Sequence, residues 1–224
     1  MDWVVLSLLN GLSLGTVLFI LATGLSIVLG LMGIVNLAHG ALFMVGGYVG
    51  WTIAVQLGLD YVLAVLAGGI IAGLIGLGIE RGFLSGMYKL TLDQALLTAG
   101  FVYILTNLTL WIWSADFRIP FTAPILSGSI NLVGWQYPIH RIVTIVVGFI
   151  ILLILWWFHE KTRAGTIIRA GMDDKQMTIG LGINLNRVNR ITFFMGAFAA
   201  GASGVIAAQM MTLNLSMGFE ILAL

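Results

Sequence analysis

The sequence predicts an all-α, polytopic transmembrane helix bundle. Of its 224 residues, 60% are apolar and only 8% are charged, and the mean hydropathy is +1.08. Soluble domains carry about 25% charged residues, so this chain has too little polar surface to cover a water-soluble globule. Apolar runs of about 20 residues indicate membrane-spanning helices rather than a β-barrel. The composition excludes a cytosolic enzyme, a nucleic-acid binder and a disordered regulator.

Uncharged runs divide the chain into about six expected spans. The stretch 3–59 contains no charged residue and is long enough for two helices. Asn36, His39 and several glycines lie in the second of these, and they are compatible with a broken or re-entrant start. The expected spans are 4–31, 34–57, 61–79, 96–113, 138–158 and 191–211.

The loops between the spans set the orientation. The connection 114–138 holds all three prolines and is expected to be an ordered extramembrane loop, while 160–190 carries six basic and three acidic residues. Because basic residues are retained on the cytoplasmic side, the 160–190 loop should be cytoplasmic, together with the 80–92 loop. The 114–138 loop and the N-terminus then lie outside. Residues 212–224 begin a further apolar run that stops partway, so we expect one transmembrane domain, 1–224, that is incomplete at its C-terminus.

The chain lacks the motifs of an energy-coupling or catalytic centre. It contains no phosphate-binding loop, no H-E-x-x-H and no Cys, and its acidic residues lie at span ends, in loops or in the C-terminal run. A lone His39 makes a metal site improbable. We therefore expect no catalytic residue, cofactor, metal or nucleic-acid partner. Energy for uphill transport would have to come from another protein.

The segment around Asn36, His39 and Gly40 is the most distinctive part of the first half. Asn36 and His39 are three residues apart and would share one helix face. Unpaired, each would cost several kcal/mol in hydrocarbon, in the range of about 2–7 kcal/mol. The residues therefore either line a substrate path or clamp two helices together, and the clamp is favoured because polar intramembrane groups commonly hold helices together.

Small residues recur every four positions in the last expected span, and they predict close helix packing. Whether this stripe faces its own bundle or a second subunit is left open by the sequence. The stripe consists of Gly196, Ala200, Gly204 and Ala208.

The 160–190 loop mixes apolar and charged residues. Ile168, Met172 and Ile179 fall on one side at helical spacing, which predicts a short helix protruding between the fifth and sixth spans. The loop is either a solvated connection or a docking element for a cytoplasmic subunit.

Two segments together resemble one family. Asn36-Leu37-Ala38-His39-Gly40 and the following Gly46-Gly47 look like the signature near the second span of permeases of branched-chain amino acid ABC importers. Arg163-Ala164-Gly165, Arg169-Ala170, Asp173-Asp174 and Leu181-Gly182-Ile183-Asn184 resemble the cytoplasmic coupling loop of the same family. The resemblance covers essentially the whole chain and is greatest to the LivH-type permease subunit.

The resemblance implies a permease subunit of an ATP-driven importer in the inner membrane of a prokaryote. Its partners would be cytoplasmic ATP-binding subunits, a second permease subunit or a second copy, and a periplasmic or extracellular substrate-binding protein. Within 160–190, the residues expected to couple to the ATPase are Arg169, Asp173, Asp174, Met177 and Gly182. The substrate would be a branched-chain amino acid or a related small polar solute. A self-contained facilitator or channel is the alternative.

Gly171 and Gly180 depart from the family pattern. They stand where larger residues are usual, and we expect them to loosen the coupling helix.

Overall fold

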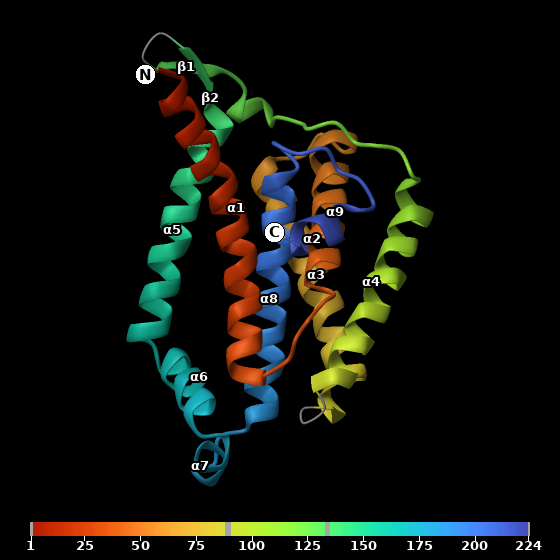
Figure 1. Cartoon of the computed structure of the whole chain (residues 1–224), viewed down its shortest axis with the longest axis vertical. Coiled ribbons are helices and arrows are strands. Elements are labelled where there is room, and N and C mark those ends of the chain that lie inside the picture. The colour runs from red at the N-terminus through yellow and green to blue at the C-terminus, as the bar shows by residue number, and fades with distance from the viewer. Residues whose placement is uncertain (1, 88–90, 133–134, 224) are drawn as a thin grey trace.

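The computed structural model describes residues 2–87, 91–132 and 135–223, which are predominantly helical (Figure 1). The α-helices in this part are α1 (Asp2–Met32), α2 (His39–Trp51), α3 (Tyr61–Gly82), α4 (Thr91–Trp113), α5 (Ile139–Lys161), α6 (Arg163–Asp173), α7 (Lys175–Gly180), α8 (Leu185–Ala207) and α9 (Met217–Leu222). There is also a π-helical turn (Thr52–Gln56), two 3-10 turns (Leu84–Gly86 and Pro124–Leu126), and the strands β1 (Ser129–Leu132) and β2 (Trp135–Pro138). Residues 88–90 of the expected 80–92 loop and residue 224 lie outside the described part.

Five of the six expected spans are confirmed as long apolar helices. The segments that are long and apolar enough to cross a bilayer are Val4–Met32, Tyr61–Gly82, Leu92–Trp113, Ile139–Phe158 and Leu185–Ala207. The last of these begins and ends earlier than the expected 191–211. It starts at Leu185 because the Asn184 side chain accepts a 3.1 Å hydrogen bond from the Arg187 backbone N–H and so caps the helix.

The expected span 34–57 has the broken start that Asn36, His39 and the nearby glycines indicated, and it becomes helical only at His39. Residues 33–38 are not helical, and Gly33 has a φ of +70°, which favours glycine. The 13 residues of α2 continue without a break into the π-helical turn Thr52–Gln56, so the helix runs over 39–56. Every residue from 39 to 50 is buried, packed against α3, α4, α8 and α9. Non-helical backbone at membrane depth is tolerated when protein surrounds it, which explains how the broken crossing can exist.

α8 is the central helix of the bundle and contacts α1, α2 and α3 through glycines (Figure 1). A methyl group at Gly196 would lie 2.8 Å from the Gly24 carbonyl oxygen of α1, and one at Gly204 would overlap the Phe43 carbonyl oxygen of α2. Gly201 lies equally close to Gly68 of α3. The small-residue stripe therefore faces its own bundle, which answers the question that the sequence left open.

The two ends of the bundle differ. At one end, β1 and β2 pair antiparallel with Ser129 opposite Pro138, and this hairpin leads into α5. This end, which we call the hairpin end, belongs to the expected 114–138 loop, whose residues 133–134 lie outside the described part and whose described residues contain the 3-10 turn Pro124–Leu126 and both strands. At the opposite end, which we call the α7 end, α6 and α7 connect α5 to α8 (Figure 1).

The glycine contacts of α8 predict a contrast between two alanine substitutions. Gly204→Ala should destabilise the protein by about 2 kcal/mol, because a methyl group would collide with the backbone of α2, which cannot move aside easily. Gly78→Ala in α3 faces open space and should stabilise the helix by up to about 1 kcal/mol. Thermal unfolding in detergent, followed by circular dichroism, measures both. Equal melting temperatures for the two variants would contradict the packing described here.

Candidate functional site

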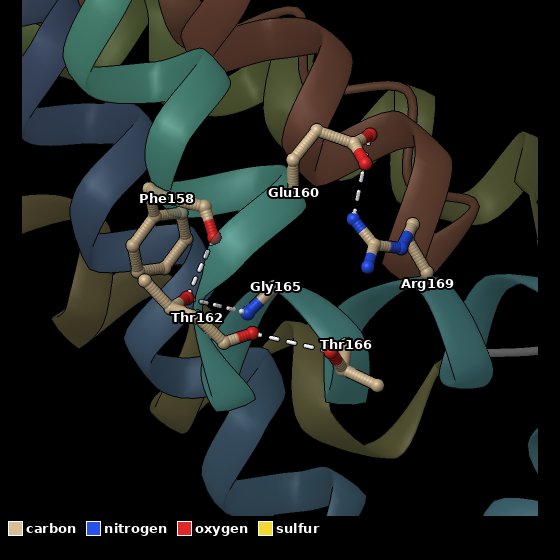
Figure 2. A network of polar contacts seen from close by, with 6 residues as sticks. All are labelled: Phe158, Glu160, Thr162, Gly165, Thr166 and Arg169. Atoms are coloured by element: carbon tan, nitrogen blue, oxygen red, sulfur yellow. Dashed lines mark hydrogen bonds and ion pairs between the residues drawn. The ribbon is translucent and has the colours of Figure 1, made fainter.

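The corner between α5 and α6 is fixed by Thr162. Its hydroxyl donates to the Phe158 carbonyl oxygen at 2.6 Å and accepts from the Gly165 N–H at 3.1 Å, so it caps α6 (Figure 2). The Thr166 hydroxyl donates to the Thr162 carbonyl oxygen at 3.2 Å. These bonds set the direction in which the chain leaves α5.

Arg169 crosses this corner. Its guanidinium lies 3.6 Å from the Glu160 carboxylate, and both side chains are partly exposed (Figure 2). An exposed ion pair contributes only about 0–1 kcal/mol to stability, so this contact orients Arg169 more than it stabilises the fold.

One face of α6 is packed against the end of α1. Ile168 is buried in a cluster with Val28, Leu31 and Met32. Gly171 is buried against Leu31, and a methyl group there would lie 2.9 Å from the Leu31 Cδ1. Gly171 thus permits close contact between α6 and α1, a role different from the loosening expected from the sequence.

The two acidic residues of the loop have different roles. Asp173 is the last residue of α6 and its side chain is exposed. Asp174 is the N-cap of α7, and its Oδ1 accepts hydrogen bonds from the backbone N–H groups of Gln176 and Met177, both at 2.9 Å. The structure therefore gives Asp174 an internal partner and leaves Asp173 facing outward.

The loop contains two helices where one was expected, and this corrects the predicted apolar face. The chain is extended at Asp174, so α6 and α7 point in different directions and Ile179 does not share a face with Ile168. Ile168 is buried, whereas Ile179 is 58% exposed. Gly182, with a φ of +81°, ends the turn that follows α7 and donates to the Ile179 carbonyl oxygen.

The tip of α7 presents apolar side chains at the α7 end. Met177, Ile179 and Leu181 are 66%, 58% and 72% exposed. We call these three residues the α7 tip. Met177 was expected to be a coupling residue, whereas Leu181 was named only as part of the segment that resembles the coupling loop and not as a coupling residue. The four-residue spacing of Met177 and Leu181 was the signal that could have identified it.

The second group of predicted residues lies inside the bundle. His39 is fully buried, and its Nε2 lies 3.1 Å from the Leu21 carbonyl oxygen of α1. Gly40 packs against the Gly218 backbone at the start of α9, where no side chain would fit. Both contacts join α2 to neighbouring helices, the arrangement that a helix clamp requires.

Asn36 differs from these two. It is 2% exposed, and neither atom of its side-chain amide has a hydrogen-bond partner among the described residues. A polar residue of α4 that sequence reasoning missed, Thr98, holds the neighbouring backbone: its Oγ1 accepts from the Leu37 N–H at 3.1 Å and lies 3.2 Å from the Val35 carbonyl oxygen. The non-helical segment before α2 is thereby satisfied by a side chain 61 residues away.

Together, the five long apolar helices, the buried broken crossing and the amphipathic corner at α6 and α7 define a multi-pass helical membrane protein. The family described as "Branched-chain amino acid transport system / permease component" matches residues 7–224. The chain belongs to this family. It is a transport component, and the family is not itself catalytic.

Curated relatives agree with this assignment. The chain is 32% identical over 212 residues to the high-affinity branched-chain amino acid transport system permease protein LivH of Salmonella typhimurium, covering 89% of this chain and 69% of that protein. The same figures hold for LivH of Escherichia coli strain K12. BraD of Pseudomonas aeruginosa, a protein with the same description, is 32% identical over 228 residues, which is 95% of this chain and 73% of BraD. No solved structure gives a significant match.

Because Asp174 caps α7, we expect a hydrogen-bond acceptor in its side chain to be required at this position and its negative charge not to be. Asp174→Asn should keep the cap and transport close to the wild-type rate, whereas Asp174→Ala should cost about 1 kcal/mol of α7 stability and reduce transport. Uptake of radiolabelled substrate into cells, normalised to the amount of protein in the membrane, measures this. If Asp174→Asn were as defective as Asp174→Ala, the carboxylate charge would be the required feature and the cap would not.

Proposed function

We propose that this chain is the permease subunit of an ATP-driven ABC importer. It would translocate branched-chain amino acids, or a related small polar solute, across the inner membrane of a prokaryote. Family membership and the names of LivH and BraD support the substrate class. The observation that carries the coupling role is the α7 tip, because three exposed apolar side chains on a capped helix at the end of the bundle are suited to docking another protein.

The proposed partners follow from this role. ATP-binding subunits would contact α7 from the cytoplasm, a second permease subunit or a second copy would complete the pathway, and a periplasmic or extracellular substrate-binding protein would approach the hairpin end. The excess of basic residues in 160–190 supports a cytoplasmic α7 end. Residues 1–224 would act as a single transmembrane permease domain, with 160–190 as its coupling loop.

The coupling residues would divide into two kinds. Met177 and the exposed Asp173 would contact the ATP-binding subunit, while Asp174, Gly182 and Arg169 would position them. Asp174 caps the start of α7, Gly182 ends the turn that follows it, and Arg169 is held to Glu160 across the corner. In this proposal only Met177 and Asp173, and not all five expected coupling residues, would touch the ATP-binding subunit.

Movement of α7 would reach the bundle by two short connections. α6 is packed on the end of α1 through Ile168, and α8 begins at Leu185, a few residues after α7 ends. Lys175 adds a third contact, since its Nζ lies 3.4 Å from the Met32 carbonyl oxygen. Displacement of α7 by an ATP-binding subunit would therefore shift α1 and α8 against each other.

Inside the bundle, we assign His39 and Gly40 to the clamp and Asn36 to the pathway. His39 contacts Leu21 of α1, and Gly40 contacts α9. The Asn36 amide has two polar atoms without protein partners among the described residues, so it is available to a polar solute at this depth.

If the ATP-binding subunit docks on the α7 tip, a negative charge introduced into the tip should prevent binding, whereas the same charge on a neighbouring residue should not. Met177→Glu should abolish binding of the ATP-binding subunit and ATP-driven uptake, because a buried carboxylate would have no partner in an apolar contact. Gln176→Glu places the same charge on the neighbouring exposed residue of α7 and should keep at least half of the uptake. Co-purification of the ATP-binding subunit with each variant measures the effect. Normal co-purification with Met177→Glu would exclude the α7 tip as the docking surface.

The pathway role of Asn36 predicts a separation of activity from stability. Asn36→Leu should leave thermal stability unchanged or increase it, because it removes an unpaired buried amide, yet it should lower uptake by about tenfold, the equivalent of one lost hydrogen bond. Thr98→Val is the contrasting variant. It should destabilise the protein by about 1–3 kcal/mol because the Leu37 N–H loses its acceptor. Full uptake by Asn36→Leu would assign Asn36 to packing alone.

A further inference from the structure

A cavity of about 320 Å³ lies between α3 and α8 at the α7 end of the bundle. It is lined by Leu77, Arg81, Arg187, Arg190, Ile191 and Phe194. Three guanidinium groups from two helices therefore share one cavity, and none of its described lining residues is acidic.

A neighbouring carboxylate accounts for one of these arginines. The Glu80 carboxylate is fully buried and lies 3.8 Å from Arg190 Nε. Burying this carboxylate requires a compensating charge, and Arg190 supplies it. Arg81 and Arg187 are exposed residues beside this pair, so the cavity keeps an excess of positive charge. An anion would complement that excess.

The position of the cavity indicates which class of anion could bind there. Arg81 is the penultimate residue of α3 and Arg187 lies in the first turn of α8, so both guanidiniums start from helix ends, at the depth where a bilayer has its headgroups. Leu77 and Ile191 lie about one turn deeper and Phe194 about two turns deeper, and Ile191 is 54% exposed. The cavity is thus charged at the membrane boundary and apolar towards the hydrocarbon.

The apolar part continues along α8. A second cavity of about 380 Å³ shares Phe194 with the first and lies where α8 faces α1 and α5, with Met195, Phe198 and Ala202 on its α8 side and Ile27 and Ile151 opposite. Its only polar side chain among the described lining residues is that of Thr23. A water-soluble acidic protein would use the arginines but not this groove, whereas a phospholipid would use both.

We propose that this surface binds an anionic phospholipid, with the phosphate held by Arg81, Arg187 and Arg190 and one acyl chain lying on Phe194 and Phe198. Guanidinium groups bind phosphate oxygens through paired, charge-assisted hydrogen bonds. Basic pockets between transmembrane helices on the cytoplasmic side bind lipid headgroups in this way. This site is separate from the α7 tip and does not depend on the coupling role.

The test compares lipid binding to the purified full chain and to two charge-matched double variants. Arg81→Gln/Arg187→Gln removes two guanidiniums from the cavity and leaves the Arg190–Glu80 pair intact. Lys161→Gln/Arg163→Gln removes the same net charge from exposed positions at the same end. Phosphatidylglycerol and phosphatidylcholine with identical acyl chains are titrated into each protein in detergent, and bound lipid is counted by native mass spectrometry.

We expect the wild type and the Lys161/Arg163 variant to retain phosphatidylglycerol in preference to phosphatidylcholine. The Arg81/Arg187 variant should bind phosphatidylglycerol about 30-fold more weakly, since each arginine near an anionic lipid surface adds about a factor of five. Equal binding of the two lipids by the wild type would overturn the proposal, as would undiminished phosphatidylglycerol binding by the Arg81/Arg187 variant.

Discussion

The close approach of α8 to α1, α2 and α3 is the constraint on which the rest of the structure depends. At Gly196, Gly201 and Gly204 the facing backbone leaves no room for a side chain. Helix association in a bilayer gains little from the hydrophobic effect, so it relies on such backbone contact and dispersion. Because α8 is surrounded in this way, α2 can be buried at its side, and Ile34, Asn36 and Ala38 of the non-helical segment are buried with it.

The same constraint links the α7 end to the interior. α8 is the helix with the closest neighbours, and it is also the helix that directly follows α7 in the chain. Close-packed interfaces are not continuously deformable, so a force on α7 would move α8 as a unit rather than bend it. In the proposed importer, this property would convert docking of an ATP-binding subunit into a relative shift of α1 and α8.

Much of the bundle could be predicted from the sequence because apolar length is a strong signal. The expected spans 61–79 and 96–113 agree closely with the observed helices Tyr61–Gly82 and Leu92–Trp113. Asn36, His39 and the glycines beside them indicated the break before α2, but the side chain that satisfies its backbone could not be predicted, because the contact with Thr98 is a tertiary one. The division of the 160–190 loop into two helices, α6 and α7, at Asp174 was also not predicted from the sequence. Asp174 was expected to contact the ATP-binding subunit, whereas its side chain caps a new helix.

The central claim is that the α7 tip contacts an ATP-binding subunit, and site-specific photocrosslinking in intact cells tests it most directly. A photoreactive amino acid is placed at Met177, and separately at Gly11 of α1, which has open space around it near the hairpin end. We expect a crosslink from position 177 to a protein carrying a phosphate-binding loop, and none to that protein from position 11. If a chain that transports normally gave no such crosslink from position 177, the α7 tip would not be the docking surface.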